Sequence, residues 1–401
     1  MINLESKSLK VIIFTYLFPN SISPTSGIFN LSRAKALINL GCEVIVVAPI
    51  SLNFLKLNIF PHLRLITQFR FSKQLFNIPE IECYEGIKVY HPKWYKFPNK
   101  YFWKYSASIL HLFIGKKVKK IIEEFGPDLI ISTWLNPFAA YSRYLPNHNS
   151  VKKFALAEGS DLLVDSTSFN GWGKIENIIN KNCNIFIAVS NNMKNHIQIK
   201  TKLRNVKVIR NGYDDTIFYY QERYSHKRDG VIKIITVANF QPAKGQEILL
   251  ESLKWISIPI HLTLVGDGPL LKYCQNIYQN ANGYVNFIGS VPHEKIPDLL
   301  LNHDLFCLPS RSEGLPSAPI EAMACGLPVV GTNVGGLSEI IIDEFNGYLC
   351  KPDSPRDLAA KITMAATKEW DKEKISKWAK DNFSWEKWAN QIIGAYKIIS
   401  N

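Results

Sequence analysis

The sequence predicts an α/β protein made of two Rossmann-like domains, and the pattern and length of the chain carry that prediction. Short runs rich in Val, Ile and Phe alternate with longer segments in which apolar residues recur at helical spacing. Such alternation is typical of doubly wound parallel sheets. The 401 residues are long for one hydrophobic core and comfortable for two. We expect the two domains to face each other across a cleft, with ligands at the carboxyl ends of the strands.

The expected strands are short apolar runs, because strands buried on both faces of a parallel sheet need apolar residues throughout. In the first half of the chain they are KVIIFT (10–15), EVIVVA (43–48), DLIIS (128–132), KKFALA (152–157), IFIAVS (185–190) and VKVI (206–209). In the second half they are KIITVA (233–238), HLTLVG (261–266), VNFIG (285–289), DLFCLP (304–309) and PVVG (328–331). Residues 28–41 show helical spacing up to Gly41, and glycine commonly ends helices.

The boundary between the domains is predicted within residues 210–230, RNGYDDTIFYYQERYSHKRDG. Apolar strands pause there, and polar, charged and turn-forming residues accumulate. We therefore place the first domain at residues 1–212 and the second at 213–380, followed by a closing segment at 381–401.

Composition indicates a globular protein of a reducing compartment. Apolar residues make up 46% of the chain and charged residues 20%, which excludes a disordered chain. The seven cysteines are scattered without a C-x-x-C pair, so reduced thiols in a cytoplasmic protein are expected. The apolar run after Lys10 has only about eight residues and no cleavage site, which favours a buried strand over a secretory signal. No run approaches the roughly eighteen apolar residues of a membrane span, which favours a soluble or peripheral protein.

The net charge of +13 is concentrated in the first half of the chain. Residues 1–200 hold 24 Lys and Arg against 12 Asp and Glu, whereas residues 201–401 hold 23 against 22. Segment 91–120 mixes aromatic with basic residues, and residues 102–122 fit an amphipathic helix with a basic face. This helix predicts peripheral contact with an anionic membrane, and a solvated basic surface over an aromatic core is the alternative. Nucleic acid is not an expected partner, because no binding signature for it is present.

The stretch EGLPSAPIE (313–321) places two glutamates around a turn that leads into a helix. Ser317 is the expected N-cap of that helix, and Gly314 lets the backbone approach a ligand closely. The helix N-terminus offers unpaired N–H groups to an anion, while Glu313 and Glu321 can each accept two hydrogen bonds from a vicinal diol. A sugar, a diphosphate and a ribose suit this set. A glycosidase pair of carboxylates and a plain capped surface helix are the alternatives.

The longer stretch SRSEGLPSAPIEAMACGLPVVGTNVGGLSEII (310–341) closely resembles the C-terminal signature of family-four retaining glycosyltransferases of the GT-B fold. The hallmark of that family is two glutamates with seven residues between them, which Glu313 and Glu321 match. Other landmarks of the family resemble FPNSISPTSGIFNLSRAKALINLG, VIRNGYDDTIF, VANFQPAKGQEILLESL, LTLVGDGPL and VNFIGSVPHEKIPDLL. The resemblance implies an N-terminal acceptor-binding domain, a C-terminal domain that binds a nucleotide sugar, and a closing helix that packs back on the N-terminal domain.

The resemblance also implies roles for individual residues on the donor side. Glu313 is expected to bind hydroxyls of the donor sugar, Glu321 the ribose, and Lys244 the diphosphate. Backbone groups of residues 266–269 and 289–292 are expected to approach the nucleotide base. The implied donor-binding set is Gly27, Asn239, Lys244, Gly266, Gly268, Val291, Glu313, Gly314, Leu315, Ser317 and Glu321.

Three positions depart from the usual pattern of the family. Asn239 stands where relatives carry an arginine, which leaves more of the phosphate charge to Lys244 and the helix N-terminus. Glu158 stands where a histidine often precedes a Gly-Ser-Asp motif, and Thr133 with Trp134 replaces a second common histidine. The expected acceptor side consists of Thr133, Trp134, Glu158, Ser160 and Asp161.

No nucleophile is evident across the sugar, so the resemblance implies retention by front-face substitution. The departing phosphate takes the proton of the acceptor hydroxyl, while Lys244 and the helix N-terminus stabilise its growing charge. The expected catalytic residues are Glu313, Lys244, Glu158 and Asp161, and either of the last two would orient the acceptor hydroxyl. No metal or other cofactor is expected, because fixed positive groups replace one and no cluster has ligand spacing.

These features favour a hexosyltransferase that moves a sugar from a nucleotide-diphosphate sugar to a saccharide or lipid-linked saccharide in surface polysaccharide biosynthesis. A non-transferring sugar-nucleotide enzyme of the same fold, such as an epimerase, is the second hypothesis. A binding-only subunit is the third. Asn239 and the missing histidines favour it, whereas the retained Glu313, Lys244 and Glu321 oppose it.

Overall fold

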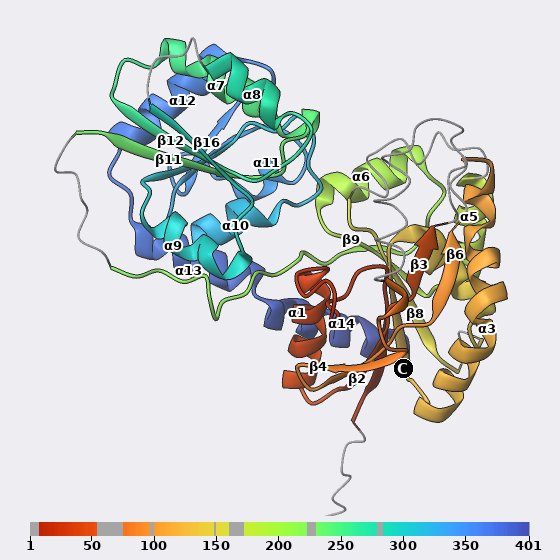
Figure 1. The fold of residues 1–401 in the computed structure, drawn as a ribbon. Helices are drawn as coiled ribbons and strands as arrows, with labels where there is room; N and C mark the ends of the chain where they lie inside the picture. Colours follow the sequence, from red (N-terminus) through yellow and green to blue (C-terminus); the bar gives the residue numbers. More distant parts are fainter. Residues whose placement is uncertain are drawn as a thin grey trace, which may run out of the picture. The chain divides into compact units, whose positions relative to one another are not determined.

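The computed structural model describes residues 8–53, 75–96, 100–147, 150–159, 172–222, 230–278 and 284–400. The chain forms two compact units, and each contains a sheet flanked by helices (Figure 1). The first unit comprises Met1–Val189, Lys194–Ile209 and Trp388–Asn401, and the second comprises Ser190–Met193 and Arg210–Lys387. Each unit has its own parallel or mainly parallel sheet, so the predicted α/β class with two Rossmann-like domains is confirmed.

The sheet of the first unit contains eight strands in the order β10-β9-β8-β7-β1-β2-β5-β4. Strand β1 is buried on both faces, as its apolar sequence predicts. The strand order reverses beside β1, because β2 pairs with one edge of β1 and β7 with the other. The bounds are β1 Lys10–Phe14, β2 Glu43–Val47, β4 Ile81–Tyr84, β5 Ile87–Tyr90, β7 Leu129–Thr133, β8 Lys152–Leu156, β9 Ile185–Ala188 and β10 Val206–Val208.

Two strand pairs of the first unit have no counterpart among the predicted strands. β4 and β5 form an antiparallel hairpin, and β3 (Ile50–Asn53) pairs with β6 (Lys93–Lys96) in a separate two-stranded sheet. In β5 the buried Ile87 and Val89 alternate with the exposed Lys88, so no continuous apolar run marks the strand. The hairpin lies at one edge of the larger sheet, and the pair of β3 and β6 forms a sheet of its own.

The helices of the first unit cover both sides of its sheet (Figure 1). The helix predicted at residues 28–41 is α1. The amphipathic helix predicted at 102–122 begins later, at Ser106, because a 3-10 helix precedes it, and the Ser106 hydroxyl donates to the Trp103 carbonyl at 2.8 Å. The bounds are α1 Ile28–Asn39, η1 Lys100–Tyr105, α3 Ser106–Phe125, η2 Leu135–Ala139, η3 Ala140–Tyr144, α5 Trp172–Asn182 and α6 Asn191–Lys200.

The closing segment of the chain breaks into two helices at Ser384. Helix α13 (Lys372–Phe383) ends there, and α14 (Trp385–Ser400) begins with the Ser384 hydroxyl accepting the Lys387 N–H at 3.2 Å. From Trp388 onward the chain belongs to the first unit, where the Trp388 ring lies 5.6 Å from the guanidinium carbon of Arg33. The closing helix therefore packs back on the first unit, as the resemblance implies.

The sheet of the second unit contains six parallel strands in the order β13-β12-β11-β14-β15-β16. Its order reverses beside β11, which has β12 on one edge and β14 on the other. The strand β16 was not expected, because its sequence GYLC is short and begins with glycine. The bounds are β11 Ile232–Val237, β12 Ile260–Val265, β13 Tyr284–Gly289, β14 Leu305–Leu308, β15 Val329–Thr332 and β16 Gly347–Cys350.

Helices pack against this second sheet and bury an apolar core that includes Leu249, Leu262 and Leu358. Among the helices of the described ranges, none has both the length and the apolar character that crossing a membrane requires. The bounds are η5 Pro242–Lys244, α7 Gln246–Ser252, η6 Leu253–Trp255, α8 Leu271–Tyr278, η7 His293–Lys295, α9 Ile296–Leu301, α10 Ser317–Ala324, α11 Leu337–Ile340 and α12 Pro355–Thr367.

Candidate active site

The two loops beside the strand reversal of the second unit bring a lysine and a glutamate into contact. Lys244 lies in the loop after β11, and Glu313 lies in the turn after β14. The Lys244 Nζ donates to Glu313 Oε1 at 2.7 Å, and the Ser310 hydroxyl donates to the same oxygen at 2.6 Å. The Glu313 side chain is 7% exposed and that of Lys244 is 27% exposed. Ligands bind at such reversals in parallel α/β sheets, so this pair marks the candidate site.

Arg311, which the sequence analysis did not single out, ties these two loops together. Its backbone N–H donates to the Ala243 carbonyl at 2.8 Å, and its Nη1 donates to the Pro242 carbonyl at 2.6 Å and to Glu247 at 2.5 Å. Its Nε donates to Asp353 at 2.7 Å. Its position two residues before Glu313 was the only sequence signal for this role. The relative position of Lys244 and Glu313 is therefore fixed by the loops that carry them.

A third loop, after β15, packs against the backbone of the Glu313 turn. Gly335 has a φ of 50°, and a Cβ at this position would lie 1.9 Å from the Glu313 carbonyl oxygen. Glycine is the residue that fits both the left-handed backbone and this close approach. The Gly336 N–H also faces the Glu313 carbonyl oxygen at 3.4 Å.

Helix α10 begins directly after this turn. Ser317 is the first helical residue, and Pro316 in extended backbone is the N-cap, so the prediction of Ser317 as N-cap is wrong by one residue. Pro316 enters the cap because its φ of −73° suits extended backbone, while Pro319 lies in the first turn of the helix. Gly314 and Leu315 immediately precede the helix N-terminus. Unpaired N–H groups at this end suit an anion.

Glu321 lies one turn into α10 and meets a histidine from the loop after β13. His293 Nε2 lies 3.3 Å from Glu321 Oε1, and the His293 ring packs edge-on against Phe218 with centroids 5.0 Å apart. The hydrogen bond with Glu321 raises the pKa of His293 above its ordinary value, although burial acts in the opposite direction. Sequence reasoning missed His293, since a single histidine in a loop carries no pattern.

The loops after β12 and β13 complete this edge of the second sheet. The Gly266 N–H donates to the Gly289 carbonyl at 2.8 Å, and the Phe240 N–H donates to the Asp267 carbonyl at 2.9 Å. These bonds place the loops after β11, β12 and β13 side by side. These loops carry the predicted base-side residues Gly266, Gly268 and Val291, together with Asn239, which was predicted at the diphosphate.

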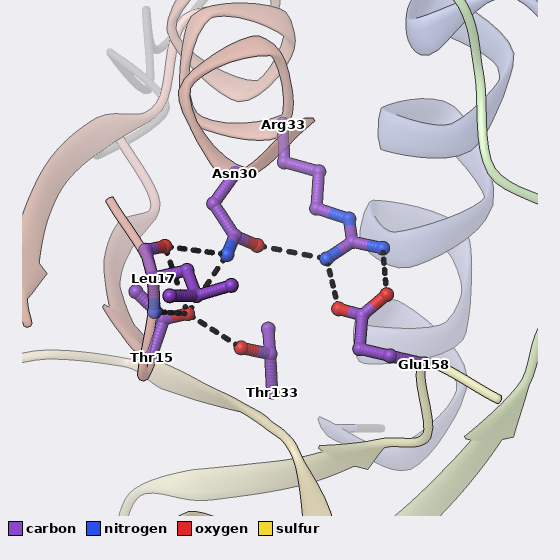
Figure 2. A network of polar contacts seen from close by, with 6 residues as sticks. All are labelled: Thr15, Leu17, Asn30, Arg33, Thr133 and Glu158. Carbon is purple, nitrogen blue, oxygen red and sulfur yellow. Dashed lines mark hydrogen bonds and ion pairs between the residues drawn. The ribbon is translucent and has the colours of Figure 1, made fainter. Parts of the chain in front are cut away.

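At the strand reversal of the first unit, polar side chains form one hydrogen-bonded network (Figure 2). The Thr133 hydroxyl, at the end of β7, donates to the Thr15 hydroxyl just after β1 at 2.7 Å. The Asn30 Nδ2, from α1, donates to the Thr15 hydroxyl and to the Leu17 carbonyl, each at 2.8 Å. Of the predicted acceptor-side residues, Thr133 therefore lies in this network.

Glu158, which follows β8, joins the same network through Arg33 of α1 (Figure 2). Arg33 Nη1 donates to Glu158 Oε1 at 2.5 Å, and Nη2 donates to Oε2 at 3.1 Å. The same Nη1 donates to Asn30 Oδ1 at 2.8 Å. The side chains are 0% exposed for Arg33 and 9% exposed for Glu158. Both carboxylate oxygens of Glu158 are thus bonded to a buried cation.

Gly27 lies at the start of α1 and touches this network through Leu17. Its φ is 70°, and a Cβ at this position would lie 2.4 Å from the Leu17 carbonyl oxygen. The Leu17 carbonyl is the acceptor that Asn30 also uses. Gly27, which the resemblance includes in the donor-binding set, is therefore packed on the acceptor-side network.

Trp134 follows Thr133 in an unusual backbone conformation, with φ 70° and ψ 129°. Non-glycine residues in such regions concentrate at functional sites. The Trp134 indole N–H and the Asn136 side-chain oxygen are buried, and neither has a hydrogen-bond partner within the described residues. The Trp134 ring lies 6.2 Å from that of Tyr16, measured between centroids. An aromatic ring beside unused polar atoms suits a sugar.

Two predicted acceptor-side residues, Ser160 and Asp161, lie outside the described residues. Within the parts of the chain that the structure describes, no three His, Cys, Asp or Glu side chains gather as metal ligands do. The prediction that no cofactor is needed therefore still awaits an experiment.

Comparison with known proteins decides the family. The profile described as "Glycosyltransferase Family 4" matches residues 28–216, and "Glycosyl transferases group 1" matches residues 221–382. An uncharacterised glycosyltransferase of Methanocaldococcus jannaschii is 31% identical over 287 residues, which cover 71% of this chain and 79% of that protein. The chain belongs to glycosyltransferase family 4. A Bacillus subtilis relative named "Putative teichuronic acid biosynthesis glycosyltransferase TuaC" is 25% identical over 362 residues, covering 88% of each chain.

Solved structures show the same fold. Sucrose-phosphate synthase of Thermosynechococcus elongatus has a TM-score of 0.74 at 18% identity, covering 98% of this chain and 99% of its own. Anabaena HepE in complex with UDP-glucose has a TM-score of 0.65 at 18% identity, covering 97% and 99%. The GT-B fold that the resemblance implied is confirmed for this glycosyltransferase.

Proposed function

We propose that this glycosyltransferase is a retaining hexosyltransferase that moves a sugar from a nucleotide-diphosphate sugar to a saccharide or lipid-linked saccharide in surface polysaccharide biosynthesis. The observation that carries the proposal is the contact of Lys244 with Glu313 beside the N-terminus of α10, at the strand reversal of the second unit. Two relatives support it, because one is named for teichuronic acid biosynthesis and another was solved with UDP-glucose.

On the donor side, each group has a task that its chemistry suits. The Lys244 ammonium binds the diphosphate together with the N–H groups of Gly314 and Leu315. Glu313 then exchanges part of its contact with Lys244 for hydroxyls of the donor sugar. Glu321 accepts hydrogen bonds from two hydroxyls of the ribose, and its contact with His293 holds the carboxylate in place.

The transfer step conserves the configuration of the anomeric carbon. The bond between that carbon and the diphosphate oxygen breaks, and a bond to the acceptor oxygen forms on the same face. The acceptor proton passes to the departing phosphate oxygen. Lys244 and the N-terminus of α10 stabilise the negative charge on that phosphate. Because these fixed groups neutralise the charge, we expect turnover to persist in excess EDTA, and a chelator-sensitive rate restored by Mg²⁺ would overturn this point.

On the acceptor side, Thr133 and Trp134 mark the position for the saccharide, and the resemblance adds Ser160 and Asp161. The Trp134 ring offers an apolar face to a sugar ring. Trp134→Leu is expected to raise the KM for acceptor and leave that for donor unchanged. Equal changes in both would argue against this placement.

We also propose that the enzyme binds peripherally to a membrane and meets its acceptor there. Helix α3 exposes Leu112 and Phe113 beside Lys116 and Lys120 on one face, since these positions are three or four residues apart. We expect the protein to co-sediment at low salt with vesicles that contain phosphatidylglycerol, and Leu112→Glu to weaken this. Ile199→Glu, at an equally exposed apolar position of α6, is the control. No sedimentation of the wild type at low salt would remove the membrane proposal.

The experiment that tests the donor role is thermal unfolding against uridine, guanosine, adenosine and thymidine diphosphates and their sugars. A ligand at one hundred times its dissociation constant adds about 2.7 kcal/mol of stability. We expect one nucleotide to stabilise the wild type and the control Glu251→Ala alike, and Glu321→Ala much less. Absence of any shift would favour a binding-only role for some other ligand. Turnover of the nucleotide sugar to its epimer without an acceptor would favour the epimerase alternative.

A further inference from the structure

We propose that Arg33 is a positioning residue of the transfer reaction, which sets the strand ends of the acceptor side through Glu158 and Asn30 without touching substrate. The proposal rests on the proposed function, because it names what holds the acceptor side of that site in place. Glu158 then serves as the counter-ion of Arg33, and it does not orient the acceptor hydroxyl.

The contact between Arg33 and Glu158 is the first part of the argument. The two guanidinium nitrogens meet the two carboxylate oxygens in a parallel pair, which fixes both position and orientation (Figure 2). The rings of Phe29 and Trp388 lie 5.2 Å and 5.6 Å from the guanidinium carbon. Arg33 is thus held by a carboxylate and by two aromatic rings inside the first unit. Such a cation supports its neighbours and has no exposed surface for a substrate.

The strand ends that the hydrogen-bonded network connects are the second part of the argument. From Arg33 it passes to Asn30, from Asn30 to Thr15, and from Thr15 to Thr133 (Figure 2). These contacts join the ends of β1 and β7 to the residue that follows β8. Ligands of parallel sheets bind at these ends. One buried side chain therefore sets the spacing of three segments from which the acceptor side is built.

Whether Glu158 has an oxygen that can accept a hydrogen bond from a ligand is the third part of the argument. Both of its oxygens accept from Arg33, and its side chain is 9% exposed. A carboxylate that orients an acceptor hydroxyl needs an oxygen open to the ligand. At the position where the resemblance implies a histidine, this chain has an acidic residue, and its cationic partner stands 125 positions earlier.

The test uses the variants Arg33→Met, Glu158→Met and the double variant. Breaking a buried pair leaves one charge uncompensated, whereas replacing both partners by apolar residues of similar size is often neutral. The assay is the release of nucleoside diphosphate from UDP-glucose, or from the nucleotide sugar that the thermal panel selects, with water as acceptor. We expect each single variant to lose about 100-fold in kcat, and the double variant to lie within about tenfold of the wild type. The KM for donor and the pH profile of kcat are expected to be unchanged in the double variant.

The matched control is the exposed ion pair of Lys35 with Glu85, which also involves α1. Lys35→Met and Glu85→Met are expected to leave kcat unchanged, because exposed pairs contribute little. A double variant Arg33→Met with Glu158→Met that is as slow as Glu158→Met alone would show that Glu158 itself acts on the reactants, and would overturn the proposal. Where a single variant fails to fold, the rate of the double variant against the wild type decides.

Equilibrium unfolding of the same variants separates failure of this inference from failure of the proposed function. The double variant is expected to regain unfolding free energy that each single variant loses. Independent, additive losses would mean that the pair does not act as a unit, and the inference falls. A wild type that turns over none of the nucleotide sugars removes the proposed function, and the positioning role of Arg33 falls with it, whatever the unfolding cycle shows.

Discussion

Replacement of Gly335 by alanine tests whether the loop after β15 sets the position of Glu313. A Cβ at Gly335 would lie 1.9 Å from the Glu313 carbonyl oxygen and 2.9 Å from the carbon that bears it. Ordinary van der Waals contact begins at 3.4 Å, so the two backbone segments have to separate by about 1.5 Å. The obstacle is backbone, which cannot swing aside as a flexible side chain does.

Two costs are expected, and a control separates them. A residue with a side chain in left-handed backbone costs about 1–2 kcal/mol whatever the space around it. Gly126→Ala carries this cost alone, because Gly126 has a φ of 63° and nothing within 4 Å of its Cβ position. A displacement of about 1 Å at a reacting centre costs about 100-fold in rate. We therefore expect Gly335→Ala to lose about 100-fold in turnover and Gly126→Ala to keep wild-type turnover.

The assay combines chemical unfolding with release of nucleoside diphosphate from the nucleotide sugar. Gly335→Ala should lose more unfolding free energy than Gly126→Ala, and its loss in turnover should exceed what the folded fraction explains. If both variants turn over donor at the wild-type rate, the loop after β15 does not position Glu313, and the reasoning is refuted.

Three further predictions concern single side chains. In calorimetry, Lys244→Met should weaken binding of a nucleoside diphosphate by about 10- to 100-fold, because a charge-assisted contact is lost. Binding of the matching nucleoside should be unchanged, and equal losses for both ligands would argue against a phosphate contact. His293 has a raised pKa in the folded protein, so its protonated form adds stability below its ordinary pKa, and this stability is lost as pH rises through the raised value. The difference in unfolding free energy between the wild type and His293→Gln should accordingly shrink with rising pH, and a constant difference would contradict the contact with Glu321. Trp388→Ala should lower the unfolding free energy by about 3–5 kcal/mol and Trp385→Ala by less, because Trp388 is buried and Trp385 half-buried; equal losses would mean that α14 does not pack through Trp388.

Most of the strands that sequence analysis predicted correctly are buried along their length, although the partly exposed edge strands β10 and β13 were predicted as well. Apolar runs such as KVIIF favour a strand over a helix because they are short and rich in β-branched and aromatic residues. The hairpin of β4 and β5 escaped prediction because only one of its faces is buried, and Lys88 between Ile87 and Val89 interrupts the run.

The donor side was predictable for a different reason. Lys244 and Glu313 stand 69 positions apart, but each follows a strand, and strand ends meet at one edge of a sheet. Topology therefore converts two separate loop positions into a contact. Ser317 illustrates the limit, because the choice between adjacent residues as N-cap depends on backbone angles that Pro316 fixes.

The Arg33 contact with Glu158 was beyond prediction from the sequence. Arg33 lies within a helix whose apolar residues recur at regular spacing, and a basic residue in such a helix is ordinarily a surface residue. The rings of Trp388 and Phe29 pack against its guanidinium, and the side chain is fully buried. The partner could not be named either, since nothing in the sequence brings residue 33 to residue 158.

This buried pair also restricts how the chain can evolve. A mutation at position 33 or at position 158 alone leaves an unpaired charge in the interior of the protein. Lineages that pass through either single change are therefore disfavoured. The two positions should therefore be inherited as a unit. Relatives with histidine at the position of Glu158 are expected to carry an uncharged residue at the position of Arg33, and those with the acidic residue are expected to carry the arginine.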